Sequence, residues 1–405
     1  MNRRTILRST PLALIGSSGL QAAGKIDSSA FDREMEKFMK PRKVPGASLA
    51  VSRNGRLVLA KGYGLADREK GISVKPETRF RIASISKPIT GAGVMKLISD
   101  GKLKWDQPIL PFAEKMNGGS LPDEMDPRWK EIKIAHLLQH TGGWNRNTAF
   151  DPMFRATAIA KDQNEKGPAG PEAVIRYMLK KPLQFDPGTD YSYSNFGYCL
   201  LGRIIEQLTG VNYESYMKSK ILKPMGIVDM RIGRSLDSFA ERETRYFMPN
   251  DEMATSVFPD KPGKVPWPYG GFHLEAMDAH GGWIASATDL IRFAAGMERS
   301  EELGLFSKED EQRLYQPPAA PVSREDGKLK ARYYGGGWLV RPGGSRNPKP
   351  NLWHSGSLPG TSTLLVRRRD GLSWAVLFNQ RSRDKNLPDG AIDPAMHRAA
   401  NATFS

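Results

Sequence analysis

The segments of this chain with strand character lie near its two ends, and a long, mostly helical section separates them. These segments are residues 46–52, 57–63, 352–357, 361–367 and 372–379. The first two flank Asn54-Gly55, a pair typical of a two-residue hairpin turn. We therefore expect a sheet that is assembled from both ends of the chain, with residues 106–316 inserted between them.

Ser84-Ile85-Ser86-Lys87 has the spacing SxxK and follows a short predicted strand, residues 80–83. Three other segments share the spacing, so it identifies no site alone: Ser99–Lys102, Ser215–Lys218 and Ser382–Lys385. The first opens an apolar helix, which places the Lys87 amine one turn above the Ser84 hydroxyl. The unpaired N–H groups of a first turn also favour negative charge there. We predict a nucleophile at Ser84; the alternative is a helix cap followed by a solvated lysine.

Tyr193-Ser194-Asn195 lies on a loop that enters a predicted helix, residues 198–208. Tyr193 can act as a general base if Lys87 lowers the pKa of its phenol. The amide of Asn195 can bind the Lys87 ammonium and a substrate carbonyl at once. The alternatives are a core aromatic at Tyr193 and a helix cap at Asn195.

His354-Ser355-Gly356 lies in the first of the C-terminal strands. Glycine in a strand permits the close approach of a ligand backbone, so Gly356 suits an edge beside a bound acyl group. The backbone N–H of Ser357, together with that of Ser84, would form an oxyanion hole. The alternative for His354 is a strand residue whose ring is hydrogen-bonded to backbone.

In this order the three motifs resemble those of the serine β-lactamase and penicillin-binding-protein superfamily, in the branch of class C β-lactamases, D-aminopeptidases and β-lactamase-like esterases. The resemblance extends from about Gly46 to Gln380 and includes HLLQHTGG at 136–143 and GGWIASATDLIRFAAGM at 281–297. It implies an α/β (α+β) fold, β-lactamase/transpeptidase-like, in which an antiparallel β-sheet flanked by helices carries an inserted helical domain. The predicted domains are an α/β sandwich, 24–105 and 317–405, and a mostly helical domain, 106–316.

The resemblance also assigns roles and implies no metal or cofactor. It makes Ser84 the nucleophile, Lys87 and Tyr193 a coupled base system and Asn195 a positioning group, and it puts His354 in a slot more often held by lysine. Gly356 and Ser357 are predicted on the substrate-binding strand. Because histidine is mostly neutral at pH 7, we expect uncharged esters or amides to be preferred. Lowering the pH toward 6 is expected to narrow this preference as His354 protonates.

The sequence therefore predicts a serine hydrolase that cleaves an ester or amide through an acyl-enzyme. Its expected partners are small-molecule esters, peptides or amides, with cell-wall peptides as a further class. A D-Ala-D-Ala carboxypeptidase or a β-lactamase is the alternative within the superfamily. A non-catalytic protein that binds or senses peptidoglycan peptides is the alternative of another class.

Composition and the first residues bear on location and partners. Residues 1–23 resemble a twin-arginine export signal, with Arg3-Arg4 ahead of an apolar run too short to span a bilayer. We expect export to the periplasm or the exterior of a bacterial cell.

Cys199 is the only cysteine and is expected to be a buried small side chain. The formal charge of +16 invites a nucleic-acid function, but the basic residues are dispersed and no groove-reading motif is present.

Overall fold

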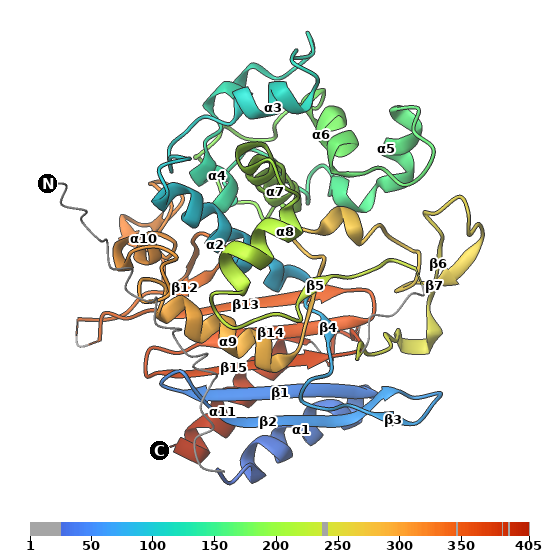
Figure 1. Cartoon of the computed structure of the whole chain (residues 1–405), viewed down its shortest axis with the longest axis vertical. Coiled ribbons are helices and arrows are strands. Elements are labelled where there is room, and N and C mark those ends of the chain that lie inside the picture. Colours follow the sequence, from blue (N-terminus) through green and yellow to red (C-terminus); the bar gives the residue numbers. More distant parts are fainter. Residues whose placement is uncertain (1–25, 237–241, 346, 383, 388, 405) are drawn as a thin grey trace, which may run out of the picture.

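The computed structural model describes residues 26–236, 242–345, 347–382, 384–387 and 389–404. The predicted export signal, 1–23, lies outside these ranges. An eight-stranded sheet forms the lower half of the molecule, and a helical layer lies above it (Figure 1). Among the described residues, no helix is long and apolar enough to cross a membrane.

The large sheet is antiparallel and combines both ends of the chain, as the sequence predicts. In spatial order its strands are β11 (Tyr333–Tyr334), β12 (Leu339–Arg341), β13 (Asn351–Leu358), β14 (Thr361–Arg367), β15 (Leu372–Phe378), β1 (Gly46–Arg53), β2 (Arg56–Asp67) and β3 (Ile72–Ser73). The two ends meet where β1 pairs with β15, with Leu49 opposite Val376. The β1–β2 hairpin turns at Asn54-Gly55, where both residues have positive φ.

Both faces of this sheet are covered by helices. Because alternate side chains of a strand point in opposite directions, neighbouring residues of one strand contact different layers. On β15, Trp374 and Val376 pack with α1 (Ser29–Arg42) and α11 (Ile392–Phe404) below the sheet. Ala375 and Leu377 belong to the other core cluster. On that second face α9 (Ala287–Glu298) contacts β15 and β1, although it lies within the range predicted for the helical domain.

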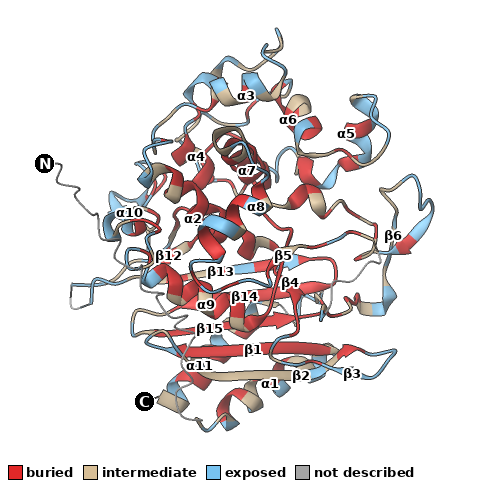
Figure 2. Cartoon of the chain, viewed as in Figure 1, coloured by how far each residue is buried: buried red, intermediate tan, exposed pale blue. Residues whose placement is uncertain are grey.

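Two packed helices, α2 (Ser86–Ser99) and α7 (Asn195–Thr209), form the centre of the helical layer and are largely buried (Figure 2). Ser194 caps α7 by accepting from the N–H of Gly197, and Gly210 ends it in the left-handed conformation. The other helices of this layer and its margins are α3 (Leu110–Met116), α4 (Ile134–Leu138), α5 (Ala156–Asp162), α6 (Pro171–Leu179), α8 (Tyr213–Met217) and α10 (Lys308–Arg313). Cys199 is buried in α7.

Short strands and helical turns complete the fold. A three-stranded sheet of β4 (Phe80–Arg81), β8 (Trp283–Ala285) and β5 (Arg231–Ile232) leads into α2. The remaining strand pairs are β6 (Met253–Thr255) with β7 (Lys264–Pro266) and β9 (Arg324–Glu325) with β10 (Lys328–Leu329). The one-turn helices are Ala83–Ile85, Pro127–Glu131, Pro152–Phe154, Lys218–Leu222, Pro249–Asp251, Glu275–Met277 and Asp389–Ala391.

Candidate active site

Ser84 lies in a one-turn helix between β4 and α2, two residues before α2 begins. The preceding residue, Ala83, has a φ of 49°, a left-handed conformation that costs a non-glycine residue on the order of 1 kcal/mol. The hydroxyl of Ser86 donates to the Ala83 carbonyl at 2.7 Å, and the N–H of Ile82 donates to the Trp283 carbonyl at 2.9 Å. These bonds hold the strained turn that presents the Ser84 hydroxyl.

Strand β13 packs directly against the backbone of this turn at Gly356. A Cβ atom on Gly356 would lie 2.2 Å from the carbonyl oxygen of Ile82 and 3.1 Å from the Cβ of Ala83. The hydroxyl of Thr363 on β14 donates to the same Ile82 carbonyl at 2.9 Å. We expected Gly356 to admit a ligand backbone, but the backbone that it admits belongs to the chain itself.

Lys87 is fully buried on the first turn of α2, and its amine has three oxygen neighbours. Its Nζ lies 3.2 Å from the Oγ of Ser84, 2.8 Å from the Oδ1 of Asn195 and 2.9 Å from the carbonyl oxygen of His280. Burial holds the pKa of Lys87 well below its usual value. A neutral amine has two N–H donors, and the two carbonyl-type oxygens can only accept. The lone pair of the neutral amine is then left for the Ser84 hydroxyl.

Asn195 begins α7 and connects Lys87 to a carboxylate that the sequence did not suggest. While its oxygen accepts from Lys87, its amide nitrogen donates to the Oδ2 of Asp151 at 2.6 Å. Asp151 precedes Pro152 and caps a one-turn helix, and burial raises its pKa. The only local signal at Asp151 is that of a turn cap, which is why its contact with Asn195 was not predicted.

Tyr193 is partly buried beside both groups, with the Nζ of Lys87 4.7 Å from the centre of its ring. Its hydroxyl is hydrogen-bonded to Ser84, yet burial raises the pKa of the phenol above its usual value. The expected lowering of this pKa by Lys87 is therefore wrong. The physical reason is that burial favours the neutral form of both side chains, so Lys87 does not supply the positive charge on which the expectation depended.

His140 holds the loop that carries Tyr193. Its carbonyl accepts from the N–H of Ser192 at 3.0 Å, and its Nδ1 accepts from the N–H of Ser194 at 3.2 Å. The imidazole and the Tyr193 ring lie 4.3 Å apart, centre to centre. His140 belongs to the HLLQHTGG segment, and that resemblance was the only signal that could have singled it out.

His354 is buried, and both of its ring nitrogens have partners within the protein. Nδ1 lies 2.7 Å from the carbonyl of Ser355, which can only accept, so Nδ1 carries the proton. Nε2 therefore accepts from the hydroxyl of Tyr334 at 2.9 Å. Burial lowers the pKa of His354 to about 3, so the expected protonation near pH 6 is wrong.

Strand β13 has an open edge at the site. Strand β12 pairs with residues 351–353 only, and among the described residues no strand continues this pairing along 354–358. Ser355 and Ser357 are exposed there, on either side of the buried Gly356. Ser357 thus directly follows the residue that packs on the Ser84 turn, and its part in an oxyanion hole stays a prediction.

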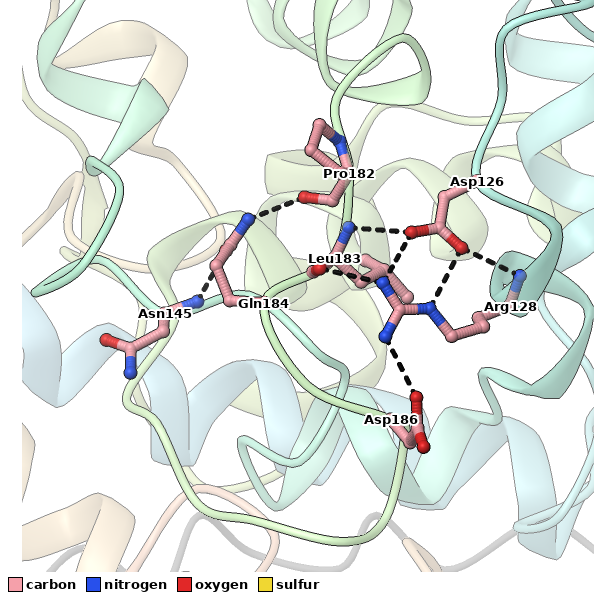
Figure 3. A network of polar contacts seen from close by, with 7 residues as sticks. All are labelled: Asp126, Arg128, Asn145, Pro182, Leu183, Gln184 and Asp186. Atoms are coloured by element: carbon pink, nitrogen blue, oxygen red, sulfur yellow. Dashed lines mark hydrogen bonds and ion pairs between the residues drawn. The ribbon is translucent and has the colours of Figure 1, made fainter.

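A polar network braces the two loops that approach Tyr193 from the helical layer (Figure 3). Arg128 binds Asp126 through two nitrogens and lowers the pKa of that carboxyl to about 2. Asp126 also accepts from the N–H of Leu183 at 3.0 Å. One residue on, the side chain of Gln184 accepts from the N–H of Asn145 at 2.9 Å. The segment before Arg146 is thereby tied to the segment that leads into Tyr193.

Comparisons with known proteins agree with this fold. Protein flp of Staphylococcus aureus (strain COL) is 26% identical over 357 residues, 87% of this chain and 63% of that protein. The chain thus spans less than two thirds of the length of this relative. Penicillin-binding protein 4* of Bacillus subtilis (strain 168) is 24% identical over 364 residues, 86% of this chain and 71% of that protein.

Solved structures and a family model extend the comparison. A penicillin-binding protein homologue from Pyrococcus abyssi superposes with a TM-score of 0.68 at 25% identity, covering 93% of this chain and 77% of its own. D-amino acid amidase from Ochrobactrum anthropi SV3 gives a TM-score of 0.69 at 22% identity, covering 93% and 98%. The model of the family described as Beta-lactamase matches residues 31–395. The chain therefore belongs to the Beta-lactamase family, whose fold is that of serine hydrolases.

Proposed function

We propose that this protein hydrolyses an ester or amide through an acyl-enzyme on Ser84, with Lys87 as the base. The observation that carries the proposal is the set of hydrogen bonds around Lys87. Asn195 and the His280 carbonyl take its two donors, and its lone pair faces Ser84. An amine arranged in this way has its lone pair directed at the nucleophile.

In the acylation step the Ser84 oxygen attacks the substrate carbonyl and its proton passes to the Lys87 amine. The negative charge that develops on the carbonyl oxygen is stabilised by the backbone N–H groups of Ser84 and Ser357. Tyr193 is hydrogen-bonded to Ser84 and retains its proton, so it can donate that proton to the departing alcohol or amine. The proton held by Lys87 then returns to the phenol oxygen.

In the deacylation step the same groups act on water. The neutral Lys87 amine takes a proton from a water molecule, whose oxygen attacks the acyl carbon. The bond to Ser84 breaks as Tyr193 donates its proton to the serine oxygen, and the proton held by Lys87 then returns to the phenol oxygen. The net reaction consumes one water and releases an acid together with an alcohol or amine.

The absence of a positive charge at His354 favours esters and amides over β-lactams as substrates. The ring is neutral, and its two nitrogens are occupied by Ser355 and Tyr334, so it offers no cation to a substrate carboxylate. A charge-assisted hydrogen bond is worth about 1.5–3 kcal/mol, and its absence corresponds to roughly ten- to a hundredfold in discrimination. The likeness to a D-amino acid amidase supports amides and peptides as one substrate class.

The test combines labelling with turnover. A fluorophosphonate adduct is expected on Ser84, and Ser84→Ala is expected to abolish both labelling and hydrolysis while the protein stays folded. The substrate panel consists of short acyl esters, D-amino-acid amides and a chromogenic cephalosporin. Turnover of an ester or amide supports the proposal. Labelling at Ser99, Ser215 or Ser382 instead, or a single burst without turnover, overturns it, and the burst would indicate an acylated binding protein.

We further propose that the protein is exported through the twin-arginine route. This rests on Arg3 and Arg4 and the short apolar run that follows them. Replacement of both arginines by lysine is expected to keep the protein in the cytoplasmic fraction of the host cell. Unchanged fractionation would refute the export proposal and leave the catalytic one intact.

A further inference from the structure

A pair of opposite charges lies beside Asn195, on the loop between α4 and α5. The Oδ2 of Asp151 lies 2.6 Å from the amide nitrogen of Asn195 and 3.8 Å from the Nη1 of Arg146. The guanidinium of Arg146 also lies 4.8 Å from the centre of the Tyr193 ring. Asp151 is largely covered, whereas Arg146 is about two fifths exposed, at 41%. Asp151 is thus enclosed at the site, whereas Arg146 reaches solvent.

This pair determines which end of the Asn195 amide faces Lys87. A carboxylate can only accept hydrogen bonds, so the contact with Asp151 fixes the NH₂ group on that side. The amide oxygen must then point at Lys87, where it accepts at 2.8 Å. If the amide rotated by half a turn, its NH₂ group would compete for the lone pair that is meant for Ser84.

We propose that Asp151, braced by Arg146, is a positioning residue that keeps the amide oxygen of Asn195 on the Lys87 amine and balances the charge around it. This inference rests on the proposed function, in which Lys87 is the base. It adds two residues from outside the three motifs, and they act through Asn195 rather than on the substrate.

The charges of the pair act on Lys87 in opposite directions. The negative charge of Asp151 raises the pKa of Lys87, and the positive charge of Arg146 lowers it. The other titratable groups around the amine are His140, His280, His354, Tyr193 and Tyr198. Burial lowers the pKa of each of these histidines and raises that of each tyrosine, so all five are neutral near pH 7.

Two conservative variants test this balance. The rate of Ser84 labelling by a fluorophosphonate is measured against pH, because it requires the neutral Lys87 amine but no known substrate. The acidic limb of this profile is the range in which the labelling rate falls as the pH is lowered. Asp151→Asn keeps an oxygen for Asn195 but removes the negative charge, so the acidic limb is expected to move to lower pH. Arg146→Gln removes the positive charge, so the limb is expected to move to higher pH. Each shift is expected to be on the order of one pH unit.

Control variants separate this effect from a general change in charge. Asp190→Asn removes an exposed carboxylate three residues from Tyr193, and Arg155→Gln removes an exposed guanidinium four residues from Asp151. Both are expected to leave the limb where it is, because water screens their charges. Asp151→Ala lets the amide of Asn195 turn, so its plateau rate is expected to fall by on the order of tenfold or more, whereas Asp151→Asn retains most of the plateau.

Three outcomes would overturn the inference. The acidic limb could stay in place in both conservative variants, it could move in the same direction in both, or Asp151→Ala could label as fast as the wild type on the plateau. Circular dichroism confirms that each variant is folded. If the wild-type protein is not labelled on Ser84 at all, the proposed function itself fails, and that result is distinct from the three above.

Discussion

Replacement of Gly356 by alanine tests whether β13 sets the position of the nucleophile. The added methyl group would lie 2.2 Å from the carbonyl oxygen of Ile82 and 2.3 Å from the Oγ1 of Thr363. No side-chain rotation relieves the first contact, because that oxygen belongs to the backbone of the turn before Ser84. The strand and the turn must therefore separate. Overpacking of a well-packed core typically costs about 1–3 kcal/mol, and a backbone clash of this kind belongs at the upper end.

The assays are equilibrium unfolding in urea and the rate of Ser84 labelling. We expect Gly356→Ala to lower the free energy of unfolding by about 2–3 kcal/mol and the labelling rate by tenfold or more, because a misplacement of about 1 Å can cost a hundredfold in rate. Gly281→Ala is the control for stability, since its methyl group would have no neighbour closer than 3.8 Å. If Gly356→Ala unfolds and labels like the wild type, the packing of β13 on the Ser84 turn does not position the nucleophile.

Three further predictions concern the groups around Ser84. Tyr193→Phe and Lys87→Ala are each expected to reduce kcat/KM by about a hundredfold or more, and the double variant by much less than the product; multiplicative losses would show independent action. His354→Lys is expected to shift selectivity toward carboxylate-bearing esters by about tenfold or more, whereas wild-type selectivity stays constant between pH 8 and pH 5 because the pKa of His354 is about 3. A wild-type selectivity that changes near pH 6 would contradict this. Tyr334→Phe leaves the Nε2 of His354 buried without its donor, so a loss of about 1–3 kcal/mol is expected in urea unfolding, and an unchanged midpoint would refute the assigned hydrogen bond.

The strands of the sheet and the elements that carry the motifs were predictable, because each is indicated by residues that are neighbours in the sequence. Strand alternation, the Asn54-Gly55 turn and the apolar period of α7 each depend on neighbouring residues. One sheet from the strands at both ends of the chain was predicted, and the two ends meet where β1 pairs with β15. The structure brings Ser84, Lys87 and Asn195 within hydrogen-bonding reach, as the motif spacing indicated.

The supporting residues were not predictable, because their partners are distant in the sequence. Asp151 is 44 residues from Asn195, and its own neighbours indicate only a turn. Tyr334 is 20 residues from His354 and reaches it across an intervening strand. Burial decided the pKa values, and burial at these positions depends on how the helical layer covers the sheet. No pattern along the sequence indicates which side chains the helical layer buries against the sheet.

The same burial gives Lys87 and Tyr193 complementary roles. It removes the proton from the amine by lowering the pKa of Lys87, and it keeps the proton on the phenol by raising the pKa of Tyr193. Burial therefore favours an uncharged base beside an uncharged acid, as an attack followed by expulsion of a leaving group requires. The base form is present above the pKa of Lys87, so activity is expected to fall as the pH drops through that value. A neutral His354 fits this arrangement, because a cation in its place would add to the positive charge around Lys87 and lower the basicity of the amine further.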